Sequence, residues 1–166
     1  MDLFKNFLTE LPYSLAGTIY RSPLPNSPLF DPEGRVLPAY EAAGVETVVM
    51  LNTIDELQAL LGYDLIALYD ELGYDLIHAP VPDFQTPPMA VFQPALDRIL
   101  AAAKEGRTIV IHCHAGIGRT GTLAACLAKV VFGLSGEDAV TWVRQFIPDA
   151  VENRAQYQFV LDYKIP

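Results

Sequence analysis

The sequence has little cysteine, few basic side chains and no long apolar run. Its two cysteines, Cys113 and Cys126, are too few for a disulfide framework, so we expect a reducing compartment and place the protein in the cytoplasm. Eleven Lys and Arg stand against 20 Asp and Glu, a net charge of −9, whereas a nucleic-acid surface needs clustered positive charge. No apolar run reaches the ~18 residues that span a bilayer, and no secretory signal is visible. The sequence therefore predicts no nucleic-acid partner and no membrane span.

The chain does have an apolar content of 51% and an alternation of strand and helix patterns. We expect a single α/β domain over residues 1–166, with a central, mainly parallel, twisted sheet flanked by helices, acting as a monomer. Apolar, β-branched runs predict strands over residues 18–21, 45–51, 74–79 and 108–111. Helical spacing predicts helices over residues 36–43, 54–61, 64–72, 89–105, 123–131, 135–147 and 152–163, and a short one across the first 15 residues.

The most informative segment is the decapeptide His-Cys-His-Ala-Gly-Ile-Gly-Arg-Thr-Gly at residues 112–121, between a predicted strand and a predicted helix. The backbone N–H groups of such a loop turn toward one point, where the helix N-terminus adds positive charge. Arg119 can bind two phosphate oxygens in a bidentate fork, and a Cys113 thiol facing this field should be a thiolate. The segment therefore predicts phosphoryl transfer to sulfur. The residues that line the predicted cup are His114, Ala115, Gly116, Ile117, Gly118 and Arg119.

This segment resembles the signature of the cysteine-dependent protein tyrosine phosphatase superfamily, which is His-Cys, five residues, Arg, then Ser or Thr. His112, Cys113, Arg119 and Thr120 match it. The resemblance implies the phosphatase fold, a phosphocysteine intermediate, and no metal or other cofactor. It also implies that His112 supports neighbouring backbone and that Thr120 donates its hydroxyl to the thiolate, although Thr120 could equally cap the helix that follows.

A general acid must come from outside the cysteine loop, because a Cys–Arg cup cannot protonate a leaving group. The proline-rich loop 80–88 offers Asp83, 30 residues before Cys113, a spacing similar to that of the superfamily. The alternative is a turn aspartate that hydrogen-bonds its own backbone. In that case Asp75 or Asp55 would be the candidate acid.

The segment at residues 152–157 resembles a superfamily segment whose glutamine orients the hydrolytic water, and Gln156 stands at that position. A surface glutamine on a helix is an equally good interpretation. Asn153 departs from the pattern, because relatives often carry Thr there.

Three further residues have open roles. We expect His114 to lie in the wall of the cup and add charge when protonated, and Cys126 to be buried packing. Arg21 either lines the cleft or forms a surface salt bridge. We predict no metal site, because His112, Cys113 and His114 are adjacent in sequence and cannot surround one ion.

These features predict a phosphoric monoester hydrolase that acts on a phosphorylated protein or a small phosphoester. A compact domain without the long recognition loop of tyrosine-specific enzymes implies a shallow cleft for phosphotyrosine and also phosphoserine or phosphothreonine. The alternatives are an inositol-phosphate or phosphoinositide phosphatase, for which the loop lacks lysines, and a catalytically silent phosphate-binding module. A rhodanese-like sulfurtransferase and an arsenate reductase fit the Gly-Arg-Thr-Gly context less well.

Overall fold

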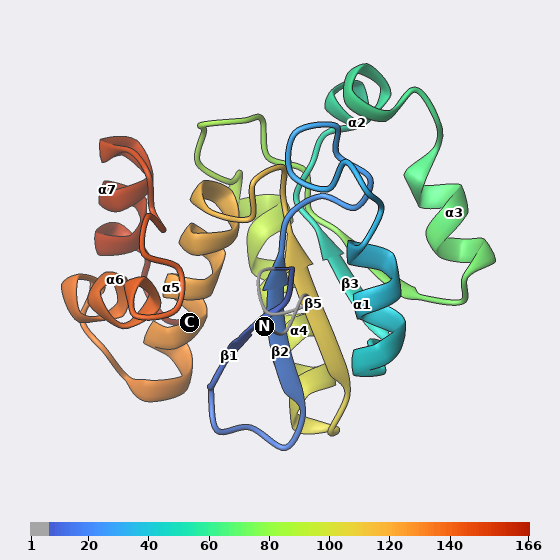
Figure 1. The fold of residues 1–166 in the computed structure, drawn as a ribbon. Coiled ribbons are helices and arrows are strands. Elements are labelled where there is room, and N and C mark those ends of the chain that lie inside the picture. The colour runs from blue at the N-terminus through green and yellow to red at the C-terminus, as the bar shows by residue number, and fades with distance from the viewer. Residues whose placement is uncertain (1–6) are drawn as a thin grey trace.

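Five strands form one sheet in the order β1-β2-β5-β3-β4 (Figure 1). Only β1 is antiparallel to its neighbour, and the other pairs are parallel. The structure, a computed structural model, describes residues 7–166. The strands are β1 (Thr9–Leu11), β2 (Thr18–Ser22), β3 (Thr47–Met50), β4 (Asp75–His78) and β5 (Thr108–His112). The predicted α/β class and mainly parallel sheet are confirmed.

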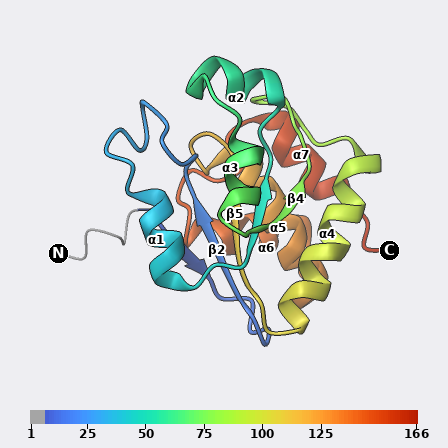
Figure 2. The ribbon, with the colours of Figure 1, turned by 90° about the vertical axis from the view of Figure 1, so that its right-hand side faces the viewer.

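Helices cover both faces of this sheet, and none within residues 7–166 is long and apolar enough to cross a membrane. The core accordingly has two clusters, one with α1, α2 and α3 and the other with α4 to α7. Figure 2 shows α1 and α4 on opposite sides of the strands. In the described part of the chain the helices are α1 (Val36–Ala43), α2 (Ile54–Leu61), α3 (Leu65–Glu71), α4 (Met89–Lys104), α5 (Gly118–Phe132), α6 (Gly136–Arg144) and α7 (Arg154–Asp162).

The central strand β5 is buried on both faces, which explains its unbroken apolar sequence. Ile109 and Ile111 belong to the cluster with α4 to α7, whereas Val110 belongs to the other. This is the period of two that strand geometry imposes.

The helix expected across the first 15 residues is wrong for the part that the structure describes. Residues 1–6 lie outside the described residues, and Thr9–Leu11 forms β1, paired antiparallel with β2. Pairing with the open edge of β2 gives this short segment backbone partners and buries Leu11, which overrides its weak helical pattern. The predicted helix over 135–147 also ends earlier, at Arg144.

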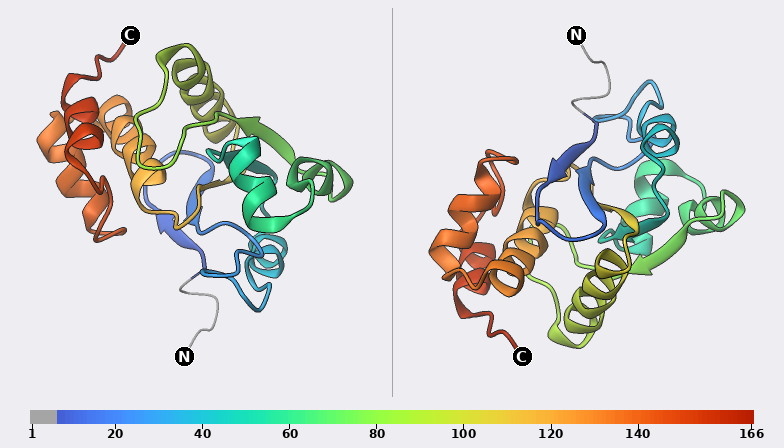
Figure 3. Two further views of the ribbon diagram at one scale, coloured as in Figure 1. Left: turned by 90° about the horizontal axis from the view of Figure 1, so that it is seen from above. Right: turned by 90° about the horizontal axis from the view of Figure 1, so that it is seen from below.

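Three loops meet at the carboxyl edge of the sheet, where open α/β sheets bind ligands. They are the loop after β5, the acid loop (residues 80–88) after β4, and residues 23–35 after β2. Figure 3 (left) shows the loop after β5 near the centre of this edge. The fold therefore brings together the segments that the sequence nominated.

Candidate active site

The loop after β5, residues 113–118, is shaped by glycines at close approaches of the backbone. Gly116 has a φ of +73°, and a Cβ there would collide with the carbonyl oxygen of Ser22. A Cβ on Gly118 would collide with the Glu152 carboxylate. Cys113 is only 2% exposed and directly follows β5, and α5 begins at Gly118. This is the predicted strand, loop and helix, with the cysteine at its base.

Residues 21–24 support this loop from outside. Arg21 donates from Nε to the carbonyl oxygen of Gly116 at 3.1 Å, and the N–H of Leu24 donates to the carbonyl oxygen of His114 at 2.9 Å. Burial lowers the pKa of Arg21. Arg21 thus takes neither of its two expected roles, since it binds a loop carbonyl that it turns away from the cup.

Arg119 is held by a partner that the sequence analysis did not identify. Its two terminal nitrogens donate to the two carboxylate oxygens of Glu56, each at 2.7 Å, and Nη1 also donates to the carbonyl oxygen of Val81 at 2.8 Å. Burial alone would lower the pKa of Arg119, but the Glu56 hydrogen bonds raise it. Nε is buried without a partner among residues 7–166, so the edge formed by Nε and Nη2 is the edge that can meet a phosphate.

Asp83 lies beside this guanidinium. Its Oδ1 is 3.2 Å from Nη2 of Arg119, and the same oxygen accepts from the N–H of Phe84 at 2.9 Å. Both sequence interpretations of Asp83 therefore have a basis in the structure, because the side chain makes the local turn and also faces the arginine. The other two candidate acids differ in position. Asp75 begins β4, at the opposite edge of the sheet from Cys113, and Asp55 lies in the first turn of α2.

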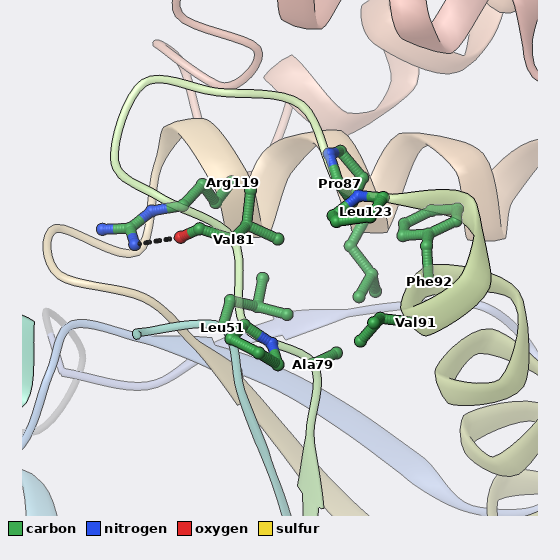
Figure 4. Close-up of a pocket in the computed structure, with 10 residues that line it drawn as sticks. Leu51, Ala79, Val81, Pro87, Val91, Phe92, Arg119 and Leu123 are labelled. Carbon is green, nitrogen blue, oxygen red and sulfur yellow. Dashed lines mark hydrogen bonds between the residues drawn. The ribbon is translucent and has the colours of Figure 1, made fainter. Parts of the chain in front are cut away.

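The acid loop crosses an apolar crevice before it enters α4. Figure 4 shows the loop arching from Val81 to Pro87, with Phe92 and Leu123 beneath its second end and the hydrogen bond from Arg119 to Val81 at its first. The two ends of the loop are thus packed, while its middle stands above the crevice.

His112 is neutral and fixed in one tautomer. Burial lowers its pKa to about 4. Nδ1 lies 3.2 Å from the carbonyl oxygen of Cys113, which can only accept, so Nδ1 carries the proton. Nε2 must then accept from the Tyr69 hydroxyl at 2.8 Å. His112 therefore holds the backbone of the cysteine, as the resemblance implies.

His114 lies in the cleft wall, packed edge-on against Phe30, and its Nε2 is 3.1 Å from Oγ of Ser27. Burial lowers its pKa, against the opposing effects of Glu56 and Asp83. The lowered pKa works against the added charge that the sequence analysis expected at this position.

Two predicted residues have less direct placements. The Thr120 hydroxyl oxygen is buried without a partner in the described part of the chain, and the N-cap position of α5 is Ile117, so Thr120 does not cap this helix. Gln156 is fully buried, which rules out a surface glutamine. Its Oε1 accepts from the N–H of Glu152 at 3.0 Å.

Glu56, Asp83 and His114 have ligand atoms within 4.8 Å of one another, a grouping that could hold a metal ion. Both Glu56 oxygens, however, already accept from Arg119. The guanidinium is thus the cation that these carboxylates hold in this structure.

The sequence analysis missed Glu56 because its position has a sufficient structural explanation. Thr53 and Glu56 form the capping box that begins α2, a common pattern at helix starts. The available signal was its place shortly after β3, whose carboxyl end points to the same edge as that of β5.

The cleft above the cysteine has a volume of about 260 Å³. Two of its lining side chains are large, apolar and exposed, namely Leu29 at 71% and Phe84 at 62%. Its other lining residues are Phe30, Asp83, Cys113, His114, Ala115, Gly118 and Glu152. A single phosphate thus meets an arginine at the base of a cleft with apolar side chains at its rim.

Comparison with known proteins agrees with this geometry. A family model described as "Polymorphic toxin system, DSP-PTPase phosphatase" matches residues 36–131, more than half of the chain. The chain belongs to this phosphatase family. It is a dual-specificity-like member of the cysteine-dependent protein tyrosine phosphatase superfamily, as the signature resemblance implied.

Individual relatives are more distant. Cyclin-dependent kinase inhibitor 3 from Homo sapiens is 26% identical over 126 residues, covering 75% of this chain and 59% of the relative. The chain thus spans about three fifths of the length of this curated relative. The crystal structure of kinase associated phosphatase superposes with a TM-score of 0.84 at 22% identity over 92% of this chain and 90% of that one, a likeness of fold. Tk-PTP in its active form superposes with a TM-score of 0.75 at 28% identity, covering 95% and 98%.

Proposed function

We propose that this protein hydrolyses phosphoric monoesters through a phosphocysteine intermediate, with phosphotyrosine in proteins as the main substrate and phosphoserine or phosphothreonine as further ones. The observation that carries the proposal is the convergence of Cys113, Arg119 and Asp83 at one edge of the sheet. A silent phosphate-binding module would need the cysteine and the arginine but would have no use for an aspartate facing them.

In the first step, sulfur attacks phosphorus in line and the bond to the ester oxygen breaks. The free edge of Arg119 binds the equatorial oxygens, together with the loop N–H groups of residues 114–118. Asp83 gives its proton to the departing oxygen. The neutral leaving group departs and the phosphoryl group remains on Cys113.

In the second step, water attacks phosphorus and sulfur leaves as a thiolate. Asp83, now ionised, accepts a proton from that water, which restores both groups to their starting states. The Thr120 hydroxyl is proposed to stabilise the departing sulfur, and Gln156 to assist the water. For Gln156 this requires its amide to leave the hydrogen bond with Glu152.

The rim of the cleft favours an aryl monophosphate over a polyphosphate. Leu29 and Phe84 offer apolar surface to an aromatic ring, whereas Glu152 presents a carboxylate where a second phosphate would lie. Burial and nearby Asp83 raise the pKa of Glu152. No lysine lines the cleft.

A substrate panel assayed in EDTA tests the proposal. We expect phosphotyrosine peptides to have the highest kcat/KM, phosphoserine and phosphothreonine peptides to be slower, and inositol polyphosphates and phosphoinositide vesicles to be slowest. Fastest turnover of an inositol phosphate or a phosphoinositide would replace the protein substrate with that class. Absence of turnover throughout, together with phosphate binding, would instead indicate a silent module.

Arg119→Lys should lower kcat more than it raises KM. Lysine keeps the charge but loses the planar fork that binds Glu56 on one edge and phosphate on the other. Loss of one preorganised donor to a transition state costs about 10²- to 10³-fold in kcat. Steady-state kinetics on phosphotyrosine would measure this. Arg98→Lys is the control, since Arg98 pairs with Asp75 on the surface, and unchanged kcat in Arg119→Lys would exclude bidentate binding.

A further inference from the structure

The middle of the acid loop has few anchors apart from its two ends. At the first end, the N–H of Val81 donates to the carbonyl oxygen of Leu51 at 2.9 Å, and at the second, Pro87 lies over the apolar crevice (Figure 4). In between, Phe84 has a φ of +62°, an unfavourable conformation for a bulky side chain, and its ring is mostly exposed. Neither backbone preference nor side-chain burial holds Phe84 in place.

Asn153 supplies the missing anchor. Its side-chain Nδ2 donates to the carbonyl oxygen of Phe84 at 2.8 Å, while its Oδ1 accepts from the N–H of Gln156 at 2.9 Å. Only one orientation of the amide makes both bonds, because one partner accepts and the other donates. Asn153 therefore caps α7 and binds the acid loop at the same time.

The segment that presents Asn153 is itself fixed. Arg144 in α6 donates to the carbonyl oxygens of Ala150 and Val151, at 3.0 and 3.1 Å. Gln156 accepts from the N–H of Glu152 at 3.0 Å. The acid loop is thus tied to a rigid support rather than to another loose segment.

The other strong contact of the loop centre is one that catalysis must break. Asp83 pairs with Nη2 of Arg119 at 3.2 Å, on the edge of the guanidinium that a phosphate would occupy. Once a phosphoester binds there, Asp83 must leave this contact and turn toward the leaving oxygen. From then on, the bond from Asn153 is the contact left to hold the loop over the substrate.

We propose that Asn153 is a positioning residue for the general acid, which it keeps over the bound ester by holding the carbonyl of Phe84. The inference rests on the proposed function of Asp83. It also gives a role to the residue that departs from the superfamily pattern, since the amide can donate to one segment while it caps another.

Two substitutions separate the two bonds of Asn153. Asn153→Asp has nearly the same shape and remains a good N-cap, but it cannot donate to Phe84. Asn153→Ser also keeps a cap, is neutral, and is too short to reach the loop. With phosphotyrosine we expect both to lower kcat by roughly 2- to 12-fold, the effect of one net hydrogen bond on a two-state equilibrium. With an activated aryl phosphate, which needs little acid, kcat should not change.

Equal kcat values in the variants and the wild type with phosphotyrosine would overturn the inference, and so would an equal loss with both substrates. Thermal unfolding provides the structural control, since a retained cap should leave Tm close to that of the wild type. If the wild type itself proved inactive, the proposed function would fail, while hydrogen exchange would still test the contact. Exchange across residues 80–88 should be faster in Asn153→Asp, and unchanged exchange would refute the anchoring role.

Discussion

Cys113→Ser should abolish turnover while leaving the fold and phosphate binding intact. Serine is close in size, so the buried base of the cup keeps its packing, but its hydroxyl is a poor nucleophile without an adjacent base. We expect kcat to fall on the order of 10⁴- to 10⁶-fold, in the range seen when other covalent enzymes lose their nucleophile. Initial rates with phosphotyrosine would measure the loss, and calorimetry with a phosphotyrosine peptide would measure the retained binding.

The second cysteine provides a matched control. Cys126 is buried in the core cluster with α4 to α7, and burial raises its pKa to about 12, so its thiol is protonated and unreactive at neutral pH. Cys126→Ser should affect stability rather than kcat. Near wild-type turnover in Cys113→Ser, or a comparable loss in Cys126→Ser, would contradict the assignment of the nucleophile.

Asp83→Asn should separate substrates by their leaving groups. An amide cannot protonate the departing oxygen, so kcat for phosphotyrosine should fall about 10²- to 10⁴-fold, the usual contribution of a general acid. An activated aryl phosphate should lose much less, since its phenoxide departs unaided. The basic limb of the pH–rate profile, which reports the protonated acid, should flatten in the variant.

Asp75→Asn is the control for this experiment, because Asp75 lies at the far edge of the sheet beside Arg98. It should leave both substrates unaffected. An equal loss with good and poor leaving groups in Asp83→Asn, with the basic limb intact, would mean that Asp83 only makes the hydrogen bond to Phe84 that shapes the turn.

The sequence predicted most of the sheet because the signals there are local. The apolar run at 108–111 and the following glycines specify a buried strand and a loop through short-range rules that a single sequence carries. The helix predicted at the start failed for the opposite reason. The strand at Thr9–Leu11 depends on the open edge of β2, a partner that local pattern does not reveal.

Within the site, the sequence identified residues that have a signature and missed those defined by contacts across the fold. Cys113, Arg119 and Asp83 are set by spacing. Glu56 holds Arg119 from 63 positions away in the chain, and Asn153 holds Phe84 from 69 positions away. Such contacts follow from which loops meet at the carboxyl edge of the sheet.

The central claim of this account is that phosphorus becomes bonded to the sulfur of Cys113. The most direct test is to mix the protein with a fast aryl phosphate, stop the reaction in acid during the first turnovers, and analyse the peptides by mass spectrometry. We predict that the peptide with Cys113 gains the mass of one HPO₃, and that the peptide with Cys126 gains none. Rapid turnover without any phosphorylated Cys113 peptide, at times when the intermediate should accumulate, would contradict the covalent mechanism and favour direct attack by water.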